Sequence, residues 1–466
     1  MKVIILAGGG GTRLFPLSRT SFPKQFLKIG SDKTLLGQTF DRYLDLVEPK
    51  DIIVVTNKEY YYHVKAEIKE CGVEEAHILL EPSSKNTAPA IVLASRYILD
   101  KLGGDASEIV FISPSDHVIL PKDLFVNDVK TVIKAAERNM IVTIGVTPNK
   151  PEIGYGYIKI GLPWEFGHNA EKFVEKPDLA RAELYVNSGN YYWNSGMYAF
   201  SINTFMEELA LYQTEMYNLF VGNSYEEIIQ KFEEMSSISI DYAIAEKSRR
   251  VVTIPISSYW NDIGSWDAIY DVMQKDENKN VKNGDCMSID CSNSLIIGAD
   301  RLVAGIGLED MIIVETDDVI LVSKKGESQK VKEVVEKLKK TQRKEAAEHT
   351  TSYMQWGNYR LIAGGSGYKV KKITLFPGHK ILMQMHYHRS EHWIVTKGTA
   401  KITMEEEEKY VSENESIFIP KAVRHLLENP GKVDLEIIEV QNGVYLEEDD
   451  VVRLETSQLE NEGQVV

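Results

Sequence analysis

Short apolar runs alternate with amphipathic stretches over the first 275 residues. The apolar runs lie at residues 3–6, 52–55, 109–112 and 141–144. Between them, stretches such as residues 88–99 and 125–138 carry apolar residues at helical spacing. This rhythm is typical of βαβ units, in which helices cover a parallel sheet that is buried on both faces. The pattern predicts an α/β domain.

The pattern changes after residue 283. Residues 284–323 contain short β-branched segments interrupted by Gly and Asp, which predicts a small all-β module. Residues 328–348 are rich in Lys, Glu and Gln, with apolar residues at helical spacing, and this favours an exposed connecting helix. The apolar positions of that helix are Val331, Val334, Val335 and Leu338.

From Tyr359 onward, alternating strands are separated by turn residues, and no segment has a helical pattern. The turns are at Pro377-Gly378, Lys397-Gly398 and Asn429-Pro430-Gly431. About 100 residues of this kind predict a β-barrel or a double-sheet jelly roll. The sequence thus divides into an α/β domain at 1–282, a β module at 283–327, a linker helix at 328–350 and a β domain at 351–466.

The charge balance disfavours polyanionic partners. The chain of 466 residues has 69 acidic and 53 basic residues and a net charge of −16, so we expect no nucleic-acid or membrane-surface binding. Three scattered cysteines are too few for a disulfide framework. The apolar run at the N-terminus is shorter than a signal-peptide core. We therefore expect a cytoplasmic protein.

A glycine-rich segment follows the first predicted strand. Gly8, Gly9, Gly10 and Gly11 would let backbone N–H groups surround phosphate oxygens, with Thr12 and Arg13 next to them. A dinucleotide fingerprint would need glycine where Arg13 stands, and a P-loop would need Gly-Lys-Ser/Thr at its end. Both motifs are excluded, but the glycines alone are also compatible with a simple turn.

The residues after this segment reverse the local charge. Arg13, Arg19 and Lys24 occur within about 20 residues of an otherwise acidic protein, which favours an anion site.

GGGGTRLFPLSR, followed by FPKQFL, resembles the signature of mannose-1-phosphate guanylyltransferases, a branch of the sugar-phosphate nucleotidyltransferases. Further segments agree with that family in order: EP at 81–82, NTAPA at 86–90, PSDH at 114–117, GYGYI at 154–158, FVEKP at 173–177, NSGM at 194–197 and WNDIGSW at 260–266. The resemblance implies a Rossmann-like domain with a mixed sheet, which transfers GMP from GTP to mannose 1-phosphate to give GDP-mannose and pyrophosphate.

The resemblance also implies roles for individual residues. Arg13 and Lys24 would clamp the triphosphate, and Asp116 and Asp262 would hold Mg²⁺. Nucleotide binding would fall to Gly8, Gly9, Gly10, Gly11, Thr12, Asn86 and Thr87. Sugar-phosphate binding would fall to Gly156, Glu175, Lys176 and Asn194.

Taken singly, several of these residues have simpler interpretations. Asp116 follows a buried strand, where aspartate often caps a turn or helix. Glu175 and Lys176 resemble a surface ion pair. Trp260 and Trp266, on either side of Asp262, are expected to pack in the core.

Histidines cluster in the predicted β domain. Five of the ten lie between residues 379 and 425: His379, His386, His388, His392 and His425. The spacing of Gln384, His386 and Glu391 matches the first cupin metal motif with Gln in place of its first His, and His425 lies in the second motif. Two imidazoles and two oxygen donors suit Zn²⁺, while Mn²⁺, Fe²⁺ and Co²⁺ remain open.

Residues 384–393, QMHYHRSEHW, resemble the type II phosphomannose isomerases, which occur fused to the guanylyltransferase. The resemblance implies a cupin β-barrel that interconverts mannose 6-phosphate and fructose 6-phosphate with a divalent metal. His388 could be a ligand, a proton carrier or a substrate contact. Arg389 and Arg424 could hold the sugar phosphate or be surface charges.

One alternative stays open: the β domain could be a non-catalytic metal-binding, regulatory or oligomerising module. A non-catalytic sugar-nucleotide sensor in the α/β domain conflicts with the presence of Arg13, Lys24, Asp116 and Asp262 together. Because family members are commonly oligomeric, we expect a homo-oligomer.

Overall fold

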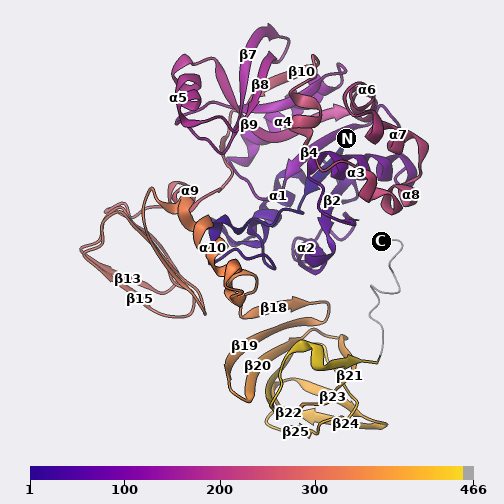
Figure 1. Ribbon diagram of the computed structural model, residues 1–466, viewed down its shortest axis with the longest axis vertical. Helices are drawn as coiled ribbons and strands as arrows, with labels where there is room; N and C mark the ends of the chain where they lie inside the picture. Colours follow the sequence, from indigo (N-terminus) through magenta and orange to yellow (C-terminus); the bar gives the residue numbers. More distant parts are fainter. Residues whose placement is uncertain (455–466) are drawn as a thin grey trace. The chain divides into compact units, whose positions relative to one another are not determined.

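The computed structural model describes residues 1–454 (Figure 1). The chain forms two compact units, Met1–Ala346 and a second that begins at Ala347. The β module and the connecting helix therefore belong to the first unit.

A nine-stranded sheet organises the first unit, in the order β3-β2-β1-β4-β9-β6-β10-β8-β7. Strands β1, β2, β3 and β4 are parallel neighbours, as are β6 and β10, whereas β7, β8 and β9 add antiparallel pairs. The strands are β1 (Lys2–Leu6), β2 (Ile52–Asn57), β3 (His77–Glu81), β4 (Ile109–Pro114), β6 (Ile141–Val146), β7 (Gly156–Trp164), β8 (Gly167–Glu175), β9 (Tyr191–Ser201) and β10 (Val251–Pro255). The residue pattern predicts the parallel part, and the mixed sheet implied by the family resemblance is confirmed.

Helices cover both faces of this sheet. Successive strand residues point to opposite sides, so the apolar residues of each strand contribute to two cores. In β1, Val3 and Ile5 join one hydrophobic core, and Ile4 joins the other. The helices are α1 (Leu35–Tyr43), α2 (Tyr61–Glu70), α3 (Thr87–Lys101), α4 (Lys122–Ala136), α5 (Leu179–Ser188), α6 (Ile202–Tyr212), α7 (Thr214–Gly222), α8 (Tyr225–Gln230) and α9 (Trp266–Val272). The apolar runs of the sequence are thus fully buried strands.

The β module is a short β-helix. One parallel sheet runs β12-β14-β16, a second pairs β13 with β15, and β17 closes the first sheet in antiparallel pairing. Its strands are β12 (Val281–Asn283), β13 (Cys286–Ile289), β14 (Leu295–Ile297), β15 (Val303–Ile306), β16 (Met311–Glu315) and β17 (Ile320–Lys324). Figure 1 shows β13 and β15 side by side.

The connecting helix α10 (Val331–Lys340) is less exposed than its charged sequence predicts. Val331 and Val335 are buried in one hydrophobic cluster with Leu14 and Phe15. Its apolar stripe therefore packs against the segment that follows the glycine-rich loop.

The second unit consists of two antiparallel sheets, ordered β18-β19-β20-β27-β22-β25 and β24-β23-β26-β21-β28. The strands are β18 (Thr351–Met354), β19 (Gly357–Gly365), β20 (Tyr368–Leu375), β21 (Lys380–His386), β22 (Arg389–Lys397), β23 (Thr399–Met404), β24 (Glu407–Ser412), β25 (Ser416–Ile419), β26 (His425–Glu428), β27 (Leu435–Gly443) and β28 (Val451–Arg453). Their inner faces bury Trp393, Ile402, Leu427 and Ile437. The predicted cupin-like barrel is confirmed.

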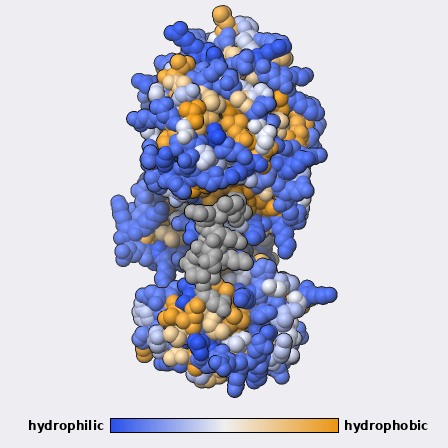
Figure 2. Space-filling view, turned by 90° about the vertical axis from the view of Figure 1, so that its right-hand side faces the viewer, coloured by the Kyte–Doolittle hydropathy of each residue, from blue (hydrophilic) through white to orange (hydrophobic). Residues whose placement is uncertain are grey.

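Polar residues predominate on the face of each unit shown in Figure 2, with apolar residues in smaller groups. Among the described residues, the cysteines Cys71, Cys286 and Cys291 are free, and no helix is long and apolar enough to cross a membrane.

Candidate active sites

The sheet topology collects the predicted transferase residues at one edge. β1 and β4 are parallel neighbours, so the glycine-rich loop after β1 and Asp116 after β4 emerge at the same edge. A small ladder between β5 (Val118–Leu120) and β11 (Tyr259–Asn261) pairs Val118 with Asn261. This pairing brings Asp262 beside Asp116, although the two residues are far apart in sequence.

Lys24 connects the two aspartates. Its Nζ lies 2.7 Å from Asp116 Oδ2 and also donates to the backbone carbonyl of Asp262. The hydroxyl of Tyr155 donates to Asp262 Oδ1 at 2.5 Å. Burial alone would raise the pKa of Asp116, but Lys24 and His117 lower it overall. Asp116 is therefore an anion held against a buried cation.

The glycine-rich loop folds onto Lys24. Gly11 has φ of 22°, and a Cβ there would lie 2.8 Å from Lys24 Cβ, so glycine is required for this close approach. Gln25 Nε2 donates to the carbonyls of Ala7 and Gly9 at 3.0 and 3.3 Å. These contacts fix the loop before any ligand binds.

Arg19 does not belong to the anion site, contrary to the expectation from local charge. Its side chain is fully buried, and its two terminal nitrogens donate to the two carboxylate oxygens of Asp318 at 2.8 and 2.7 Å. Arg13, in contrast, forms no ion pair with a carboxylate in residues 1–454 and remains available to an anionic ligand.

The two tryptophans flanking Asp262 pack, as predicted. Trp266 is fully buried, and its Nε1 donates to the carbonyl of Phe15 at 3.0 Å. Trp260 Nε1 donates to Nδ1 of His117 at 3.2 Å, and burial lowers the pKa of His117 to about 4. His117 is therefore neutral near pH 7.

Gly156 and Glu175 face each other across the β7–β8 ladder. A Cβ at residue 156 would lie 2.4 Å from Glu175 Oε2, so the glycine leaves room for the carboxylate. Glu175 Oε1 lies 2.5 Å from Lys176 Nζ. Burial raises the pKa of Glu175, and the neighbouring Lys176 opposes that rise.

A polar network surrounds Asn194. Its Oδ1 accepts from the hydroxyl of Thr143 at 2.9 Å, and its Nδ2 donates to Asp241 Oδ1 at 2.8 Å. The hydroxyl of Tyr198 also donates to Asp241 Oδ1, at 2.6 Å. Asp241 is not among the predicted site residues; it lies at the start of a π-helical turn, Asp241–Ala245. Such turns are frequent at functional sites, but no sequence pattern marks this one.

The predicted nucleotide residues after β3 form a helix N-terminus. Asn86 caps α3, its Oδ1 accepting from Thr87 N at 2.9 Å. The hydroxyl of Thr87 accepts from the backbone N–H of Ile240 at 2.9 Å. The Thr87 side chain therefore holds the segment at 238–240, which leads into the turn with Asp241.

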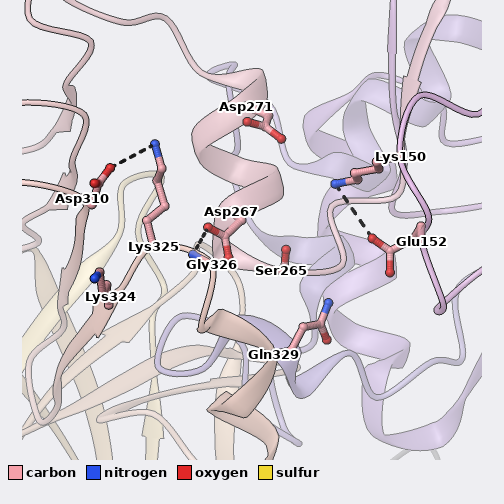
Figure 3. Close-up of a pocket in the computed structure, with 10 residues that line it drawn as sticks. All are labelled: Lys150, Glu152, Ser265, Asp267, Asp271, Asp310, Lys324, Lys325, Gly326 and Gln329. Carbon is pink, nitrogen blue, oxygen red and sulfur yellow. Dashed lines mark hydrogen bonds and ion pairs between the residues drawn. The ribbon is translucent and has the colours of Figure 1, made fainter. Parts of the chain in front are cut away.

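A cavity of about 520 Å³ lies within the first unit, between α9 and the β-helix (Figure 3). None of the predicted transferase residues lines it. Several of its charged groups have partners within the protein: Lys325 lies 3.9 Å from Asp310, Lys150 lies 3.8 Å from Glu152, and Asp267 accepts from the backbone N–H of Gly326. We therefore interpret it as a polar seam between two parts of the first unit.

The second unit gathers three of the four predicted metal ligands. Donor atoms of His386, Glu391 and His425 all lie within 4.8 Å of one another, and each residue is at most 2% exposed. Glu391 Oε1 lies 3.1 Å from His386 Nε2, and Glu391 Oε2 lies 3.7 Å from His425 Nε2. The fourth predicted ligand, Gln384, is paired directly with His425 across β21 and β26.

The chemistry of this cluster fits a divalent cation. Both ring nitrogens of His386 and Nε2 of His425 are buried without hydrogen-bond partners among the described residues. His425 Nδ1 lies 2.9 Å from the carbonyl of Val423, which fixes the tautomer that leaves the Nε2 lone pair free. Burial opposes ionisation of Glu391, but His386, His425 and Arg389 lower its pKa overall.

Three neighbouring side chains have roles that spacing could not show. Arg389 is buried and donates to Glu391 Oε1 at 3.1 Å, so it orients one of the predicted metal ligands. Arg424 donates to Glu405 Oε2 at 2.6 Å at the surface. His388 Nδ1 lies 2.7 Å from Asp450 Oδ1, while its ring is largely exposed.

The two sites and their folds define a nucleotidyltransferase joined to a cupin-type sugar-phosphate isomerase domain. Family profiles match accordingly: nucleotidyl transferase at residues 2–279, the beta-helix domain of the mannose-phosphate isomerase and GMP-like group at 284–338, and the mannose-6-phosphate isomerase C-terminal domain at 341–456. The chain therefore belongs to the nucleotidyl transferase family.

Its relatives match over their whole length. The chain is 43% identical to the xanthan biosynthesis protein XanB of Xanthomonas campestris pv. campestris, covering 97% of each chain. It is 40% identical to mannose-1-phosphate guanylyltransferase 2 of Escherichia coli O157:H7, again covering 97% of each. A crystal structure titled mannose-1-phosphate geranyltransferase, from Thermus thermophilus, superposes with a TM-score of 0.66 at 31% identity, covering 72% of this chain and 99% of that one.

Proposed function

We propose that the first unit transfers GMP from GTP to mannose 1-phosphate, giving GDP-mannose and pyrophosphate. The observation that carries this proposal is Lys24, buried between Asp116 and Asp262 beside the glycine-rich loop. Full-length relatives that include a mannose-1-phosphate guanylyltransferase support the choice of substrates.

The reaction needs positioning and charge neutralisation more than proton transfer. A phosphate oxygen of mannose 1-phosphate attacks the α-phosphorus of GTP in line, and the bond to the leaving pyrophosphate breaks. Lys24 and Arg13 would offset charge on the phosphates, and the backbone of Gly8–Thr12 would bind their oxygens. Asn86 and Thr87 would border the nucleoside.

Asp116 and Asp262 would hold Mg²⁺, because carboxylate oxygens are the hard donors that this cation prefers. The ion would supply positive charge to the reacting phosphates. Tyr155, which donates to Asp262, would keep that carboxylate oriented.

The mannose 1-phosphate would lie on the residues around Gly156. Lys176 would bind its phosphate, Glu175 and Asn194 would accept from or donate to sugar hydroxyls, and Gly156 would allow close approach of the ring. Asp241 would act through Asn194, whose amide it orients.

Pyrophosphate release tests this proposal directly. We expect release with GTP and mannose 1-phosphate to exceed that with ATP, CTP or UTP, and with glucose 1-phosphate. Equal rates with all combinations would contradict the assigned specificity, and no release with any pair would contradict the transferase itself.

We further propose that the second unit interconverts mannose 6-phosphate and fructose 6-phosphate. Gln384, His386, Glu391 and His425 would hold a divalent metal, with Zn²⁺ the first choice for this N/O donor set. The metal would polarise the substrate's oxygen atoms during the C1–C2 proton shift. His388, which Asp450 orients and whose ring is largely exposed, would carry the proton.

A non-catalytic metal module is the alternative for the second unit. Formation of fructose 6-phosphate from mannose 6-phosphate, measured with and without a chelator, separates the two. Chelator-sensitive turnover supports the isomerase, and absence of turnover in metal-loaded protein supports the alternative. Light scattering on the same sample tests the expected homo-oligomer.

A further inference from the structure

Two segments that are far apart in sequence run beside each other at the N-terminus of α3. The backbone N–H of Ile238 donates to the carbonyl of Lys85, and the N–H of Ala88 donates to the carbonyl of Ile238, each at 3.2 Å. Residues 85–88 therefore hold residues 238–240, and we call residues 238–240 the strap.

The contact at the end of the strap uses a side chain. The hydroxyl oxygen of Thr87 accepts from the backbone N–H of Ile240 at 2.9 Å. Ile240 is buried, so its N–H would be left without a partner if this acceptor were removed, and such a loss is costly. Thr87 follows Asn86, whose φ of 71° and ψ of −171° are rare for a residue other than glycine. The start of α3 is thus held in a strained conformation that the contacts with the strap help to maintain.

Asp241 follows the strap directly and contacts the predicted sugar subsite. Its Oδ1 accepts from Asn194 Nδ2 at 2.8 Å and from the hydroxyl of Tyr198 at 2.6 Å. Burial raises the pKa of Glu175, and the negative charge of Asp241 adds to this rise, so Asp241 also lies near the second predicted sugar ligand. The strap therefore connects the first turn of α3 to two residues that are expected to bind mannose.

We infer that Thr87 is a positioning residue for the mannose subsite. Its hydroxyl fixes Ile240, the strap transmits this constraint to Asp241, and Asp241 orients the amide of Asn194. The inference rests on the proposed function and reassigns one side chain within it. The backbone at residues 86–87 borders the nucleoside, whereas the side chain of Thr87 acts on the sugar.

Thr87→Val is the decisive variant, because valine has nearly the same shape but offers no acceptor to the N–H of Ile240. We expect KM for mannose 1-phosphate to rise about 10-fold, while KM for GTP changes less than about twofold. Thr87→Ser keeps the hydroxyl and should restore both values. Thr131→Val is the matched control in α4, where the Thr131 hydroxyl donates to the carbonyl of Asn127 at 3.2 Å, and it should leave both KM values unchanged.

A double-mutant cycle tests whether Thr87 acts through Asp241. Asp241→Ala should raise KM for mannose 1-phosphate more than Thr87→Val does, because it removes the group that contacts Asn194 directly. Adding Thr87→Val to Asp241→Ala should then cause little further rise. Independent effects that multiply in KM would show that the strap does not transmit the constraint, and they would overturn the inference.

Calorimetry measures the same effect without turnover. GDP-mannose occupies both subsites and GTP occupies only the nucleotide subsite, so Thr87→Val should weaken binding of GDP-mannose about 10-fold and leave Kd for GTP unchanged. Equal losses for the two ligands, or a larger rise of KM for GTP than for mannose 1-phosphate, would return the Thr87 side chain to the nucleoside and overturn the inference.

These outcomes differ from those that would remove the proposed function. Wild-type protein that releases no pyrophosphate from GTP and mannose 1-phosphate contradicts the transferase, and the calorimetric comparison then still decides the role of Thr87. Wild-type protein that binds neither GTP nor GDP-mannose would overturn both.

Discussion

The two candidate sites treat their polar groups in opposite ways. In the first unit, Lys24 pairs with Asp116 and Asp262 accepts from Tyr155, so much of the charge is already neutralised. In the second unit, both ring nitrogens of His386 and Nε2 of His425 are buried without hydrogen-bond partners among the described residues. These side chains of the first site therefore have partners within the protein before any ligand binds. The second site leaves buried imidazole nitrogens without hydrogen bonds, and a bound cation would give them a partner.

Removing Lys24 should break the first site most severely. In Lys24→Ala, the Asp116 carboxylate and the backbone carbonyl of Asp262 lose their shared cation, and we expect kcat for pyrophosphate release to fall about 100- to 1,000-fold. Isomerase activity of the same protein should not change. Lys28→Ala is the control, because Lys28 is exposed and lies 3.7 Å from Glu70. Equal losses in both variants would contradict the special role of Lys24.

Removing a buried imidazole should break the second site. We expect His386→Asn to lower metal retention after dialysis, and isomerase activity with it, at least about 100-fold. Metal content by atomic absorption and fructose 6-phosphate formation measure the two effects. His392→Asn changes an exposed histidine of the same strand as Glu391, and it should retain both metal and activity. A His386→Asn protein that keeps its metal would show that the cluster is not the metal site.

The Arg19–Asp318 ion pair stabilises the loop of the first site, although neither residue belongs to the anion site. Asp318→Asn would remove the carboxylate that accepts from both terminal nitrogens of a buried guanidinium, which costs about 3 kcal/mol of unfolding free energy. Since Arg19 lies in the loop that carries Arg13 and Lys24, we expect KM for GTP to rise about 10-fold while isomerase activity stays constant.

A double-mutant cycle with Arg19→Met tests whether the pair acts as a unit. Replacing both partners should cost less than the sum of the single changes. Additive unfolding free energies would show that the two side chains are not coupled.

The smallest expected effect is a pH dependence at His63. This residue packs on Phe22 and Phe26, with ring centroids 5.3 and 4.9 Å apart, and burial lowers its pKa to about 4. The unfolded chain, with a histidine pKa of about 6.5, binds the proton more readily, so stability is lost as pH falls from about 6.5 toward 4. Between pH 7 and pH 5 we expect a loss of about 2 kcal/mol.

His63→Phe should remove that loss. Urea unfolding of the first unit at pH 7 and pH 5, monitored by Trp fluorescence, measures this loss of unfolding free energy. An unchanged pH dependence in His63→Phe would assign the effect to another group.

The sequence predicts the fold better than it predicts the contacts between distant segments. Continuous apolar runs predict β1, β2, β4 and β6, because burial on both faces demands such runs, whereas β3 is not among the predicted strands. The antiparallel strands β7 and β8 escape such a pattern, since many of their residues are only half-buried. Family resemblance supplied the site residues, which remain predictions.

Two features of the sites, the partners of Arg19 and of Asp241, depend on tertiary contacts that sequence spacing does not encode. Local charge predicts Arg19 as an anion ligand, but its side chain binds Asp318, which is 299 residues away in sequence. Asp241 acts through Asn194 from a π-helical turn. Arg389 has the charge that suits a phosphate, but its register on β22 points it at Glu391.

The two glycine–glutamate contacts, Gly8 with Glu81 and Gly156 with Glu175, have a consequence for evolution. At both glycines a methyl group would come within 3.0 Å of a carboxylate oxygen, and neither backbone has a positive φ. Glycine is therefore required at each position by lack of space and not by backbone conformation. Whether a larger residue fits depends on the length of the glutamate side chain opposite it. Lineages that acquire alanine at either position should carry a shorter residue opposite it, so each pair should change together when substrate preference diverges.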